Sequence, residues 1–323
     1  MGERAGRGGG PGLRGACAYP GHMGARVRGR VDGLPEWDRC AVMGVVNVTP
    51  DSFSDGGRWF DTETAVKHGL DLVAQGADLV DVGGESTRPG AARVSEEEEL
   101  RRVLPVVRGL AGEGVVVSVD TMRSSVAARA VEAGAVLVND VSGGLADPGM
   151  VPVVAEARVP FVVMHWRGQS IDMNNRAVYT DVVGEVIGEL TDSVRRAVDG
   201  GIAPEHIVVD PGLGFAKRAE HDLALVAALS RLRAELARPL LVAASRKRFL
   251  GRVLADAADA APPPARERDA ATAAVSALAA REGAWAVRVH EVRASADAVR
   301  VARAVESAAE ALPGIRPVGE APR

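Results

Sequence analysis

The stretch AWAVRVH, residues 284–290, is the eighth short apolar run in this chain, and its presence decides the fold. Seven similar runs precede it: CAVMGVVNV (40–48), ADLVDVG (77–83), VVVSVDT (115–121), VLVNDVS (136–142), PFVVMH (160–165), HIVVDP (206–211) and PLLVAAS (239–245). Their near-continuous Val, Leu and Ile content is typical of strands in a parallel sheet that is covered by helices. Eight such strands are the number that closes a parallel barrel.

A helical pattern follows each apolar run. The expected helices span residues 61–76, 95–110, 123–133, 147–157, 180–200, 217–236, 266–282 and 293–311. Ser95 and Glu98 have the spacing of a capping box at the start of the second helix. The repeated unit predicts a single-domain (β/α)₈ TIM barrel over residues 38–312, close to the roughly 250 residues typical of this fold. An open doubly wound sheet has similar local patterns, but no Gly-x-Gly-x-x-Gly segment follows the first run.

The two ends of the chain have a different composition. The first 30 residues contain ten Gly and six Arg with almost nothing apolar, so they cannot bury enough surface to offset the entropy of ordering. We predict a disordered leader over residues 1–37, with Met23 as an alternative start site, and a frayed tail over residues 313–323. A basic leader could contact RNA or a membrane, but an extension without function is the simpler interpretation.

The overall composition limits the class of protein. With 47% hydrophobic and 25% charged residues and a net charge of −4, the chain carries no broad positive field that would attract nucleic acid or an anionic membrane. Its two cysteines cannot build a disulfide framework, and they have no metal-ligand spacing with the histidines. No apolar run is long enough to span a membrane. We therefore predict a cytoplasmic protein whose partners are small molecules.

Polar residues end or follow nearly every predicted strand. Catalytic residues of a barrel lie at the C-terminal ends of its strands, so this position has functional meaning. Taken alone, Asp120 could cap a helix, and Asn139 or Asp140 could close a turn. Together they would make a costly interior without a ligand. The residues concerned are Asn47, Glu85, Thr87, Arg88, Asp120, Asn139, Asp140, His165, Asp210, Ser245, Arg246, Lys247, Arg248, Arg288 and His290.

The eighth run indicates the kind of ligand. Arg288 and His290 are two residues apart, so they lie on the same face of an extended strand, and we place that face inside the barrel. Lys247 and its basic neighbours follow the seventh run, where barrels commonly bind phosphate. A phosphate or pyrophosphate is therefore the expected anion. Carboxylates and an amide from Asp120, Asn139 and Asp210 could hold the NH-bearing edge of a flat heterocycle.

Eight motifs in order resemble one known family. They are NVTPDSFSDGG (47–57), DVGGESTRPGA (81–91), VSVDT (117–121), VNDVSGG (138–144), MH (164–165), DPGLGFAK (210–217), SRKRFLG (245–251) and RVHEV (288–292). Over about residues 40–305 the chain is similar to the dihydropteroate synthases of folate biosynthesis. This resemblance implies a transferase that condenses 6-hydroxymethyl-7,8-dihydropterin pyrophosphate with 4-aminobenzoate, giving 7,8-dihydropteroate and pyrophosphate with Mg²⁺. It also implies a homodimer and a target of sulfonamides.

The resemblance also implies roles for individual residues. The pterin pyrophosphate would be bound by Asp120, Asn139, Asp210, Phe215, Lys247, Arg288 and His290, with Met164 near the ring and Asn47 at the metal. The 4-aminobenzoate would be bound by Phe53, Ser54, Thr87, Arg88, Pro89 and Arg248, below two loops at 48–58 and 84–92. Catalysis would rest on Asp55, Asp120, Asp210, Lys247 and Arg288. Arg248 departs from the family pattern, where many relatives carry Ser, but an Arg can bind a carboxylate in bidentate fashion.

Two other functions fit part of the pattern. A pterin- or folate-binding paralogue without catalytic activity would lack anion ligands or a complete first loop, and the sequence lacks neither. A pterin-barrel methyltransferase would need no pyrophosphate pocket, so Arg288 and His290 argue against it.

Overall fold

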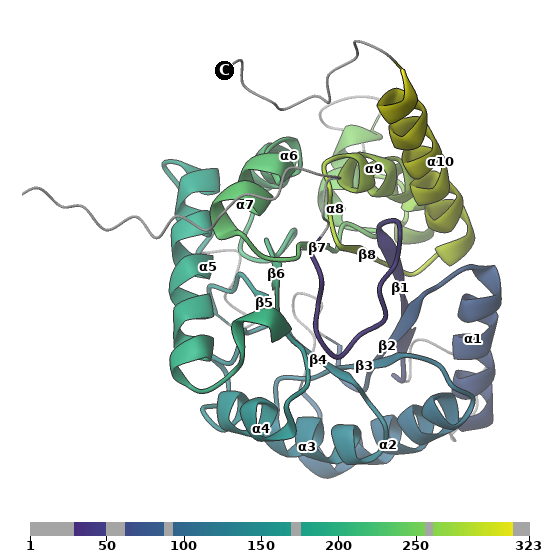
Figure 1. Ribbon diagram of the computed structural model, residues 1–323, viewed down its shortest axis with the longest axis vertical. Coiled ribbons are helices and arrows are strands. Elements are labelled where there is room, and N and C mark those ends of the chain that lie inside the picture. The colour runs from purple at the N-terminus through teal and green to yellow at the C-terminus, as the bar shows by residue number, and fades with distance from the viewer. Residues whose placement is uncertain (1–28, 50–61, 87–92, 169–175, 256–260, 313–323) are drawn as a thin grey trace, which may run out of the picture.

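The computed structural model describes residues 29–49, 62–86, 93–168, 176–255 and 261–312, and it is a parallel barrel surrounded by helices (Figure 1). The strands are hydrogen-bonded in the order β6-β5-β4-β3-β2-β1-β8-β7. A parallel bridge from Val209 to Leu240 joins β6 to the residue before β7 and closes the ring. The predicted TIM barrel is confirmed. The strands are β1 (Ala41–Asn47), β2 (Leu79–Gly83), β3 (Val117–Asp120), β4 (Leu137–Asp140), β5 (Phe161–Met164), β6 (Ile207–Asp210), β7 (Leu241–Val242) and β8 (Ala286–Val289).

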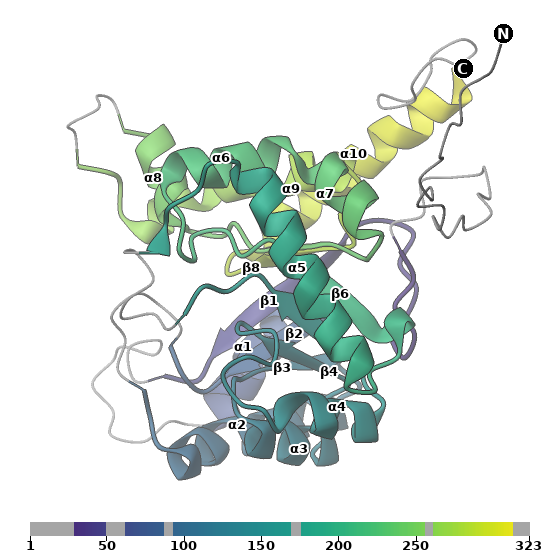
Figure 2. The same ribbon diagram turned by 90° about the vertical axis from the view of Figure 1, so that its left-hand side faces the viewer.

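The helices form the outer layer of the barrel. Figure 2 looks at the outer side of α5, which lies outside the strands. The helices are α1 (Thr62–Gln75), α2 (Glu96–Gly112), α3 (Ser124–Glu132), α4 (Met150–Ala157), α5 (Val182–Asp199), α6 (Ala219–Ala227), α7 (Leu229–Leu236), α8 (Arg248–Val253), α9 (Asp269–Arg281) and α10 (Val292–Ala311), with short 3-10 helices at Pro204–His206 and Ala265–Arg268. No helix in the described part of the chain is long and apolar enough to cross a membrane.

One predicted helix and one predicted helix cap differ from the observed structure. The helix predicted over 217–236 is divided into α6 and α7, because Ala228 leaves the helical conformation at φ −105°, ψ 17°. The capping box at Ser95 is half formed. The Ser95 hydroxyl accepts a hydrogen bond from the Glu98 N–H at 3.2 Å, but the Glu98 carboxylate accepts from Arg101 and Arg102 instead of the cap backbone.

The ordered domain begins earlier than predicted. Val31 is buried at the N-terminal end of the barrel, with Leu34 and Trp37 packed against the same cluster. The rings of Trp37 and Trp285 lie 6.0 Å apart between centroids, and the Asp32 N–H donates to the Glu205 carbonyl at 3.2 Å. The leader predicted to reach residue 37 is therefore wrong from Val31 onward. The earlier residues of that leader and the tail at 313–323 lie outside the described residues.

The barrel interior changes from apolar to polar along the strands. The part near the N-terminal ends of the strands is filled by an apolar cluster. It includes Met43, Leu79, Leu137, Val162, Val208, Leu241 and Ala286. Alternate residues of a strand point to the same side, so the next inward positions are Asp81, Asn139, Asp210 and Arg288. The apolar layers give a rigid base, and the polar layer lies at the C-terminal ends of the strands, where a barrel site is expected.

Candidate active site

Arg288 of β8 is the centre of the polar layer. Its Nε donates to Asp81 Oδ2 at 2.6 Å, and its Nη2 donates to Asp120 Oδ2 at 2.8 Å. Asn139 Nδ2 also donates to Asp81 Oδ2, at 2.8 Å. The Asp81 side chain is fully buried and that of Arg288 is 18% exposed. One guanidinium therefore joins β8 to β2 and β3, and Asp81 fixes the orientation of the Asn139 amide.

The charges in this cluster are not fully compensated. Burial raises the pKa of Asp120 to about 7, and the Arg288 cation limits the rise, while the negative charge of Asp81 adds to it. Among the described residues, the buried Asp81 Oδ1 and Ser118 Oγ have no hydrogen-bond partner. Buried polar atoms without partners are unusual in folded proteins, and their presence at the mouth of a barrel is what a binding site requires.

A second group lies at the ends of β6 and β7. Asp210 Oδ1 accepts a hydrogen bond from the Gly212 N–H at 2.7 Å, and burial raises the pKa of this carboxyl. Lys247 Nζ lies 4.2 Å from the centroid of the Phe215 ring, a cation–π contact. Burial lowers the pKa of Lys247 to about 8, against the opposing effect of the Asp210 carboxylate. The charges of Arg288 and Asp120 also affect the Lys247 pKa. The cluster around Arg288 and the cluster around Lys247 therefore lie close together at the same end of the barrel.

His290 is held by a hydroxyl from the neighbouring strand end. Ser245 Oγ accepts from the His290 backbone N–H at 3.1 Å and lies 3.0 Å from His290 Nδ1. A hydroxyl can both donate and accept, so Ser245 can pair with Nδ1 in either tautomer of the ring. The two contacts fix the position of the His290 ring beside Ser245.

The basic run after β7 divides into different roles. Arg246 makes a bidentate ion pair with Asp269, at 2.7 Å for both contacts, and its carbonyl accepts from Arg268 at 3.1 Å. It also has a left-handed backbone, φ 60°. Arg246 is therefore a structural residue and not part of the phosphate-binding charge that the sequence suggested. Arg248 is exposed at the first position of α8, and Lys247 alone of the three faces Phe215.

Not every other predicted residue points into the barrel. Asp140 points away from the barrel interior, and its carboxylate accepts from the Ser142 N–H and hydroxyl at 2.7 Å and from the Gly144 N–H at 2.9 Å. It closes a turn, which is the structural alternative that the sequence left open. Asn47, the last residue of β1, pairs in register with Gly83 and is half-buried. Phe53, Ser54, Asp55, Thr87, Arg88 and Pro89 lie outside the described residues.

The structure brings together most of the remaining predicted residues. Asp120 and Asn139 contact the Arg288–Asp81 pair, Asp210 and Phe215 flank Lys247, and His290 follows Arg288 on β8. Sequence reasoning missed Asp81. Its signal was a carboxylate in the middle of the apolar run LVDVG, because a charge on a buried strand needs a partner.

The described residues also test whether a magnesium ion would fit. They contain no group of three or more His, Cys, Asp or Glu side chains that could hold a metal ion. Magnesium usually keeps several waters and is bound through one or two protein oxygens together with substrate phosphates. The side-chain oxygen of Asn47 at the end of β1 fits such a site, in which the substrate is the main ligand.

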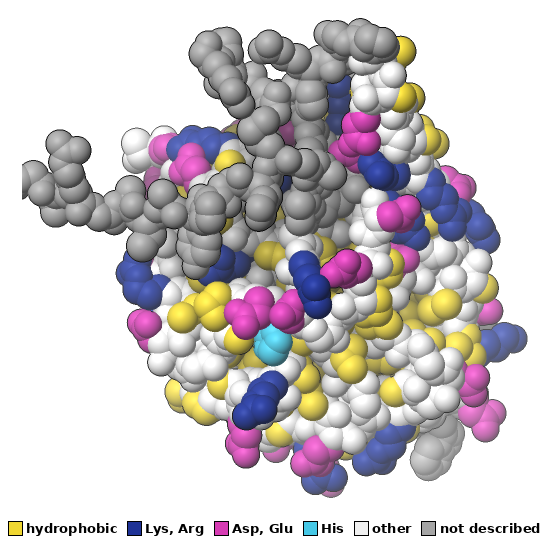
Figure 3. Space-filling view, in the orientation of Figure 1, with side chains coloured by type: hydrophobic (Ala, Val, Ile, Leu, Met, Phe, Trp, Pro, Cys, Tyr) yellow, Lys and Arg dark blue, Asp and Glu magenta, His cyan; other side chains and the backbone are white. Residues whose placement is uncertain are grey.

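Figure 3 shows charged side chains of both signs interspersed over the face drawn in Figure 1. The positive charge available to an anion is thus local, from Arg288 and Lys247 at the strand ends, and not a property of the surface as a whole.

Comparisons with known proteins agree with this geometry. The profile of the family described as "Pterin binding enzyme" matches residues 43–290. The dihydropteroate synthase of Mycobacterium leprae is 56% identical over 261 residues, covering 80% of this chain and 91% of that protein. A solved structure of Xanthomonas albilineans dihydropteroate synthase with 4-aminobenzoic acid superposes with a TM-score of 0.77 at 45% identity, covering 85% of this chain and 95% of the other. The same enzyme in complex with 7,8-dihydropteroate gives 0.74 at 42% identity, with the same coverage.

The fold, the polar mouth and the profile match define a pterin-binding enzyme built on a TIM barrel. Within that class, the chain belongs to the dihydropteroate synthase family.

Proposed function

We propose that this chain condenses 6-hydroxymethyl-7,8-dihydropterin pyrophosphate with 4-aminobenzoate, forming 7,8-dihydropteroate and pyrophosphate in folate biosynthesis. The observation that carries the proposal is the arrangement of Arg288 and Lys247 around Asp120, Asn139 and Asp210 at the C-terminal ends of the strands. Cations for a pyrophosphate and acceptors for a heterocycle thus occupy one mouth.

The orientation of Asn139 supports binding of the pterin ring. Because Nδ2 donates to Asp81, the amide oxygen is the atom left to accept from an N–H group of the pterin. Asp210 has one carboxylate oxygen engaged with Gly212 and can accept from the ring with the other. Lys247 can donate to a ring oxygen or nitrogen, and its ammonium lies 4.2 Å from the centroid of the Phe215 ring. Three side chains then recognise one edge of the ring.

The proposed reaction requires that the site stabilises negative charge on the departing pyrophosphate and positive charge on the pterin. The C–O bond to pyrophosphate breaks first, leaving a cationic pterin methylene, and the neutral arylamine then forms the C–N bond and loses a proton. Arg288 and His290 stabilise the departing pyrophosphate. Asp120, with its pKa raised to about 7, is partly ionised at neutral pH and offsets the positive charge that develops on the pterin.

We also propose that Mg²⁺ binds together with the pyrophosphate, with Asn47 as a protein oxygen ligand. The ion, when bound, would neutralise part of the pyrophosphate charge. This proposal is supported by the position of Asn47 at the end of β1 and by the preference of Mg²⁺ for oxygen and water ligands.

A cytoplasmic homodimer is part of the same proposal. The outer helices α9 and α10 carry exposed apolar side chains, with Leu278 53%, Val301 63% and Val305 57% exposed. Pairing of this face with a second copy would remove them from water, as in other symmetric dimers. Sedimentation velocity on the purified chain tests the assembly, and a monomer at all concentrations would contradict it.

One incubation tests the function. The purified protein is mixed with the pterin pyrophosphate, Mg²⁺ and labelled 4-aminobenzoate, and dihydropteroate and pyrophosphate are measured. We expect the two products in equal amounts. Tight pterin binding without product would favour a non-catalytic paralogue, and methyl transfer from methyltetrahydrofolate would favour the methyltransferase. Sulfonamides, which mimic 4-aminobenzoate, are expected to compete with it in the same assay.

A further inference from the structure

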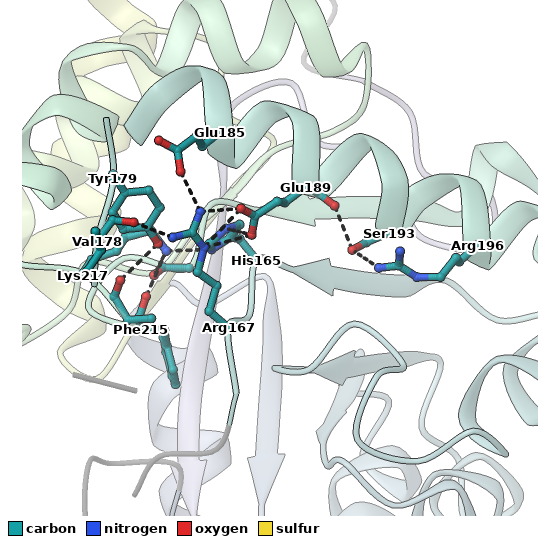
Figure 4. A network of polar contacts seen from close by, with 12 residues as sticks. His165, Arg167, Val178, Tyr179, Glu185, Glu189, Ser193, Arg196, Phe215 and Lys217 are labelled. Atoms are coloured by element: carbon teal, nitrogen blue, oxygen red, sulfur yellow. Dashed lines mark hydrogen bonds and ion pairs between the residues drawn. The ribbon is translucent and has the colours of Figure 1, made fainter. Parts of the chain in front are cut away.

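Lys217 lies behind the active site in a contact network that the proposed reaction does not use (Figure 4). Its side chain is buried, and its ammonium nitrogen has three acceptors: His165 Nδ1 at 2.9 Å, the Gly212 carbonyl at 2.9 Å and the Phe215 carbonyl at 3.0 Å. Burial lowers the pKa of Lys217 to about 7, against the opposing effect of the Asp222 and Asp210 carboxylates, and in the ammonium form each of its three hydrogens has a partner. Such complete satisfaction makes Lys217 a fixed point and not a flexible charge.

The histidine in this network is held in one tautomer. His165 Nε2 lies 3.0 Å from Glu189 Oε2 of α5, and the same carboxylate accepts from Arg167. Burial and the neighbouring Lys217 cation lower the pKa of His165 to about 4, so the ring is neutral at physiological pH. Its proton is therefore on Nε2, facing the carboxylate, and Nδ1 accepts from Lys217. We call Lys217, His165 and Glu189 the Lys217 clamp.

The segment that the clamp holds, residues 211–216, has an unusual backbone. Gly212, Gly214 and Ala216 have positive φ angles of 67°, 76° and 48°. Ala216 is not a glycine, so its left-handed conformation needs support from the surroundings. A Cβ atom at Gly212 would collide with the carbonyl oxygen of His165, so this segment lies in direct contact with the residue that follows β5. The Gly212 and Phe215 carbonyls of this segment both accept hydrogen bonds from the Lys217 ammonium.

The same segment carries residues of the proposed site. Asp210 precedes it and caps the Gly212 N–H, and Phe215 lies within it, with its ring 4.2 Å from Lys247 Nζ. In Figure 4 the Phe215 ring points away from the network while its carbonyl faces Lys217. A change at Lys217 would therefore be transmitted through the backbone to the opposite side of the segment, where the ligand would bind.

We propose that Lys217 is a positioning residue, which sets the conformation of residues 211–216 through the clamp and so places Phe215 and Asp210 against the pterin. This inference rests on the proposed function, since it assigns Lys217 a role at the same site. Lys217 faces the carbonyl side of the segment, whereas the Phe215 ring points away from it. The expected signature is therefore a change in pterin binding that exceeds any change in binding of the second substrate.

The test compares Lys217→Met with Lys67→Met, which removes an exposed lysine on α1. Methionine keeps most of the stem but removes all three hydrogen bonds. We expect the KM for pterin pyrophosphate, and its Kd by calorimetry, to rise by about 10- to 100-fold, because small displacements of positioning groups have effects of this size. The KM for 4-aminobenzoate should change much less, and Lys67→Met should match the wild type. A folded Lys217→Met protein with unchanged pterin KM and Kd would overturn the proposal, even if its melting temperature fell.

Glu189→Gln provides a second variant if Lys217→Met does not fold. The Glu189 side chain is 42% exposed, and glutamine can still accept from His165 Nε2 but carries no charge. Pterin Kd should rise in the same direction by a smaller factor, and an unchanged Kd would count against the clamp. Wild-type turnover is measured first. If the wild type forms no dihydropteroate, the proposed function fails, whereas the clamp is still judged by pterin affinity.

Discussion

Replacing Arg288 with Met should destabilise the protein by an amount that depends on pH. The change leaves a similar volume but removes the cation that contacts Asp81 at 2.6 Å and Asp120 at 2.8 Å. Both carboxylates are buried, with side-chain exposures of 0% and 6%. The variant therefore leaves two buried acceptors without their main partner.

The two carboxylates contribute differently. Removing one partner of a buried ion pair costs about 3–5 kcal/mol, and loss of the Asp81 contact should alone cost about 3 kcal/mol. Asp120 adds a pH-dependent part. Its pKa in the folded protein is raised from 3.8 to about 7, so the contribution of this carboxyl to wild-type stability falls as pH rises between these values. Below pH 7 this carboxyl is protonated and does not need Arg288. Above pH 7 the variant loses up to about 1.4 kcal/mol more for each pH unit.

Urea unfolding at about pH 5.5 and about pH 9 measures this difference. We expect Arg288→Met to lose about 3 kcal/mol at the lower pH and about 5–6 kcal/mol at the higher pH, from the ion-pair and linkage values above. The control is the same substitution in an Asp120→Asn background, where the loss should be equal at both pH values. A loss that does not depend on pH, or a dependence that survives Asp120→Asn, would refute the reasoning. Turnover of the single variant should fall by about two to three orders of magnitude.

Three further outcomes are expected. Lys247→Met should lower kcat/KM for pterin pyrophosphate about 100-fold, since it removes the donor beside Phe215; steady-state kinetics would show this. His165 should contribute up to about 3 kcal/mol less stability as pH falls from 6.5 to about 4, because its pKa in the fold is lowered to about 4 and the unfolded chain takes up the proton first; the difference in unfolding free energy between the wild type and His165→Asn should shrink by this amount over that range in urea unfolding. Arg248→Ser should raise the KM for 4-aminobenzoate about tenfold with the pterin KM unchanged, if Arg248 binds the carboxylate; an unchanged KM removes it from that pocket.

The barrel could be predicted from the sequence because its signal is local. Each strand is covered by helices on its outer side and by other side chains inside, so it appears as an unbroken apolar run. Short helices lack such a signal. α8 has six residues, RFLGRV, too few to show a helical period, and it was not predicted. Val31 and Trp37 were also missed, because two apolar residues among polar neighbours show their role only when the barrel end they cover is known.

The site could be predicted only in part. The two-residue spacing of Arg288 and His290 placed both at the strand end, but the partner of Arg288 is 207 residues away in Asp81, and no local pattern joins them. Asn139 and Asp140 are adjacent and chemically similar, yet one faces the mouth and the other closes a turn. Which one faces inward depends on the pairing register of β4 with its neighbours, because a shift of one residue reverses every side chain.

The polar layer lowers the stability of the folded protein, and a bound ligand offsets this loss. The N-terminal part of the barrel is filled with apolar side chains, as a stable core requires, whereas nearer the C-terminal ends of the strands the chain buries Asp81, Asp120 and Asp210. Burial raises the pKa of Asp120 and Asp210, which means that the fold holds these charges less easily than water does. Apolar residues at these positions would give a more stable barrel. A ligand that brings N–H donors and an anion supplies partners to these buried carboxylates and to Arg288, so the cost of burying this layer is directly related to its affinity for a pterin pyrophosphate.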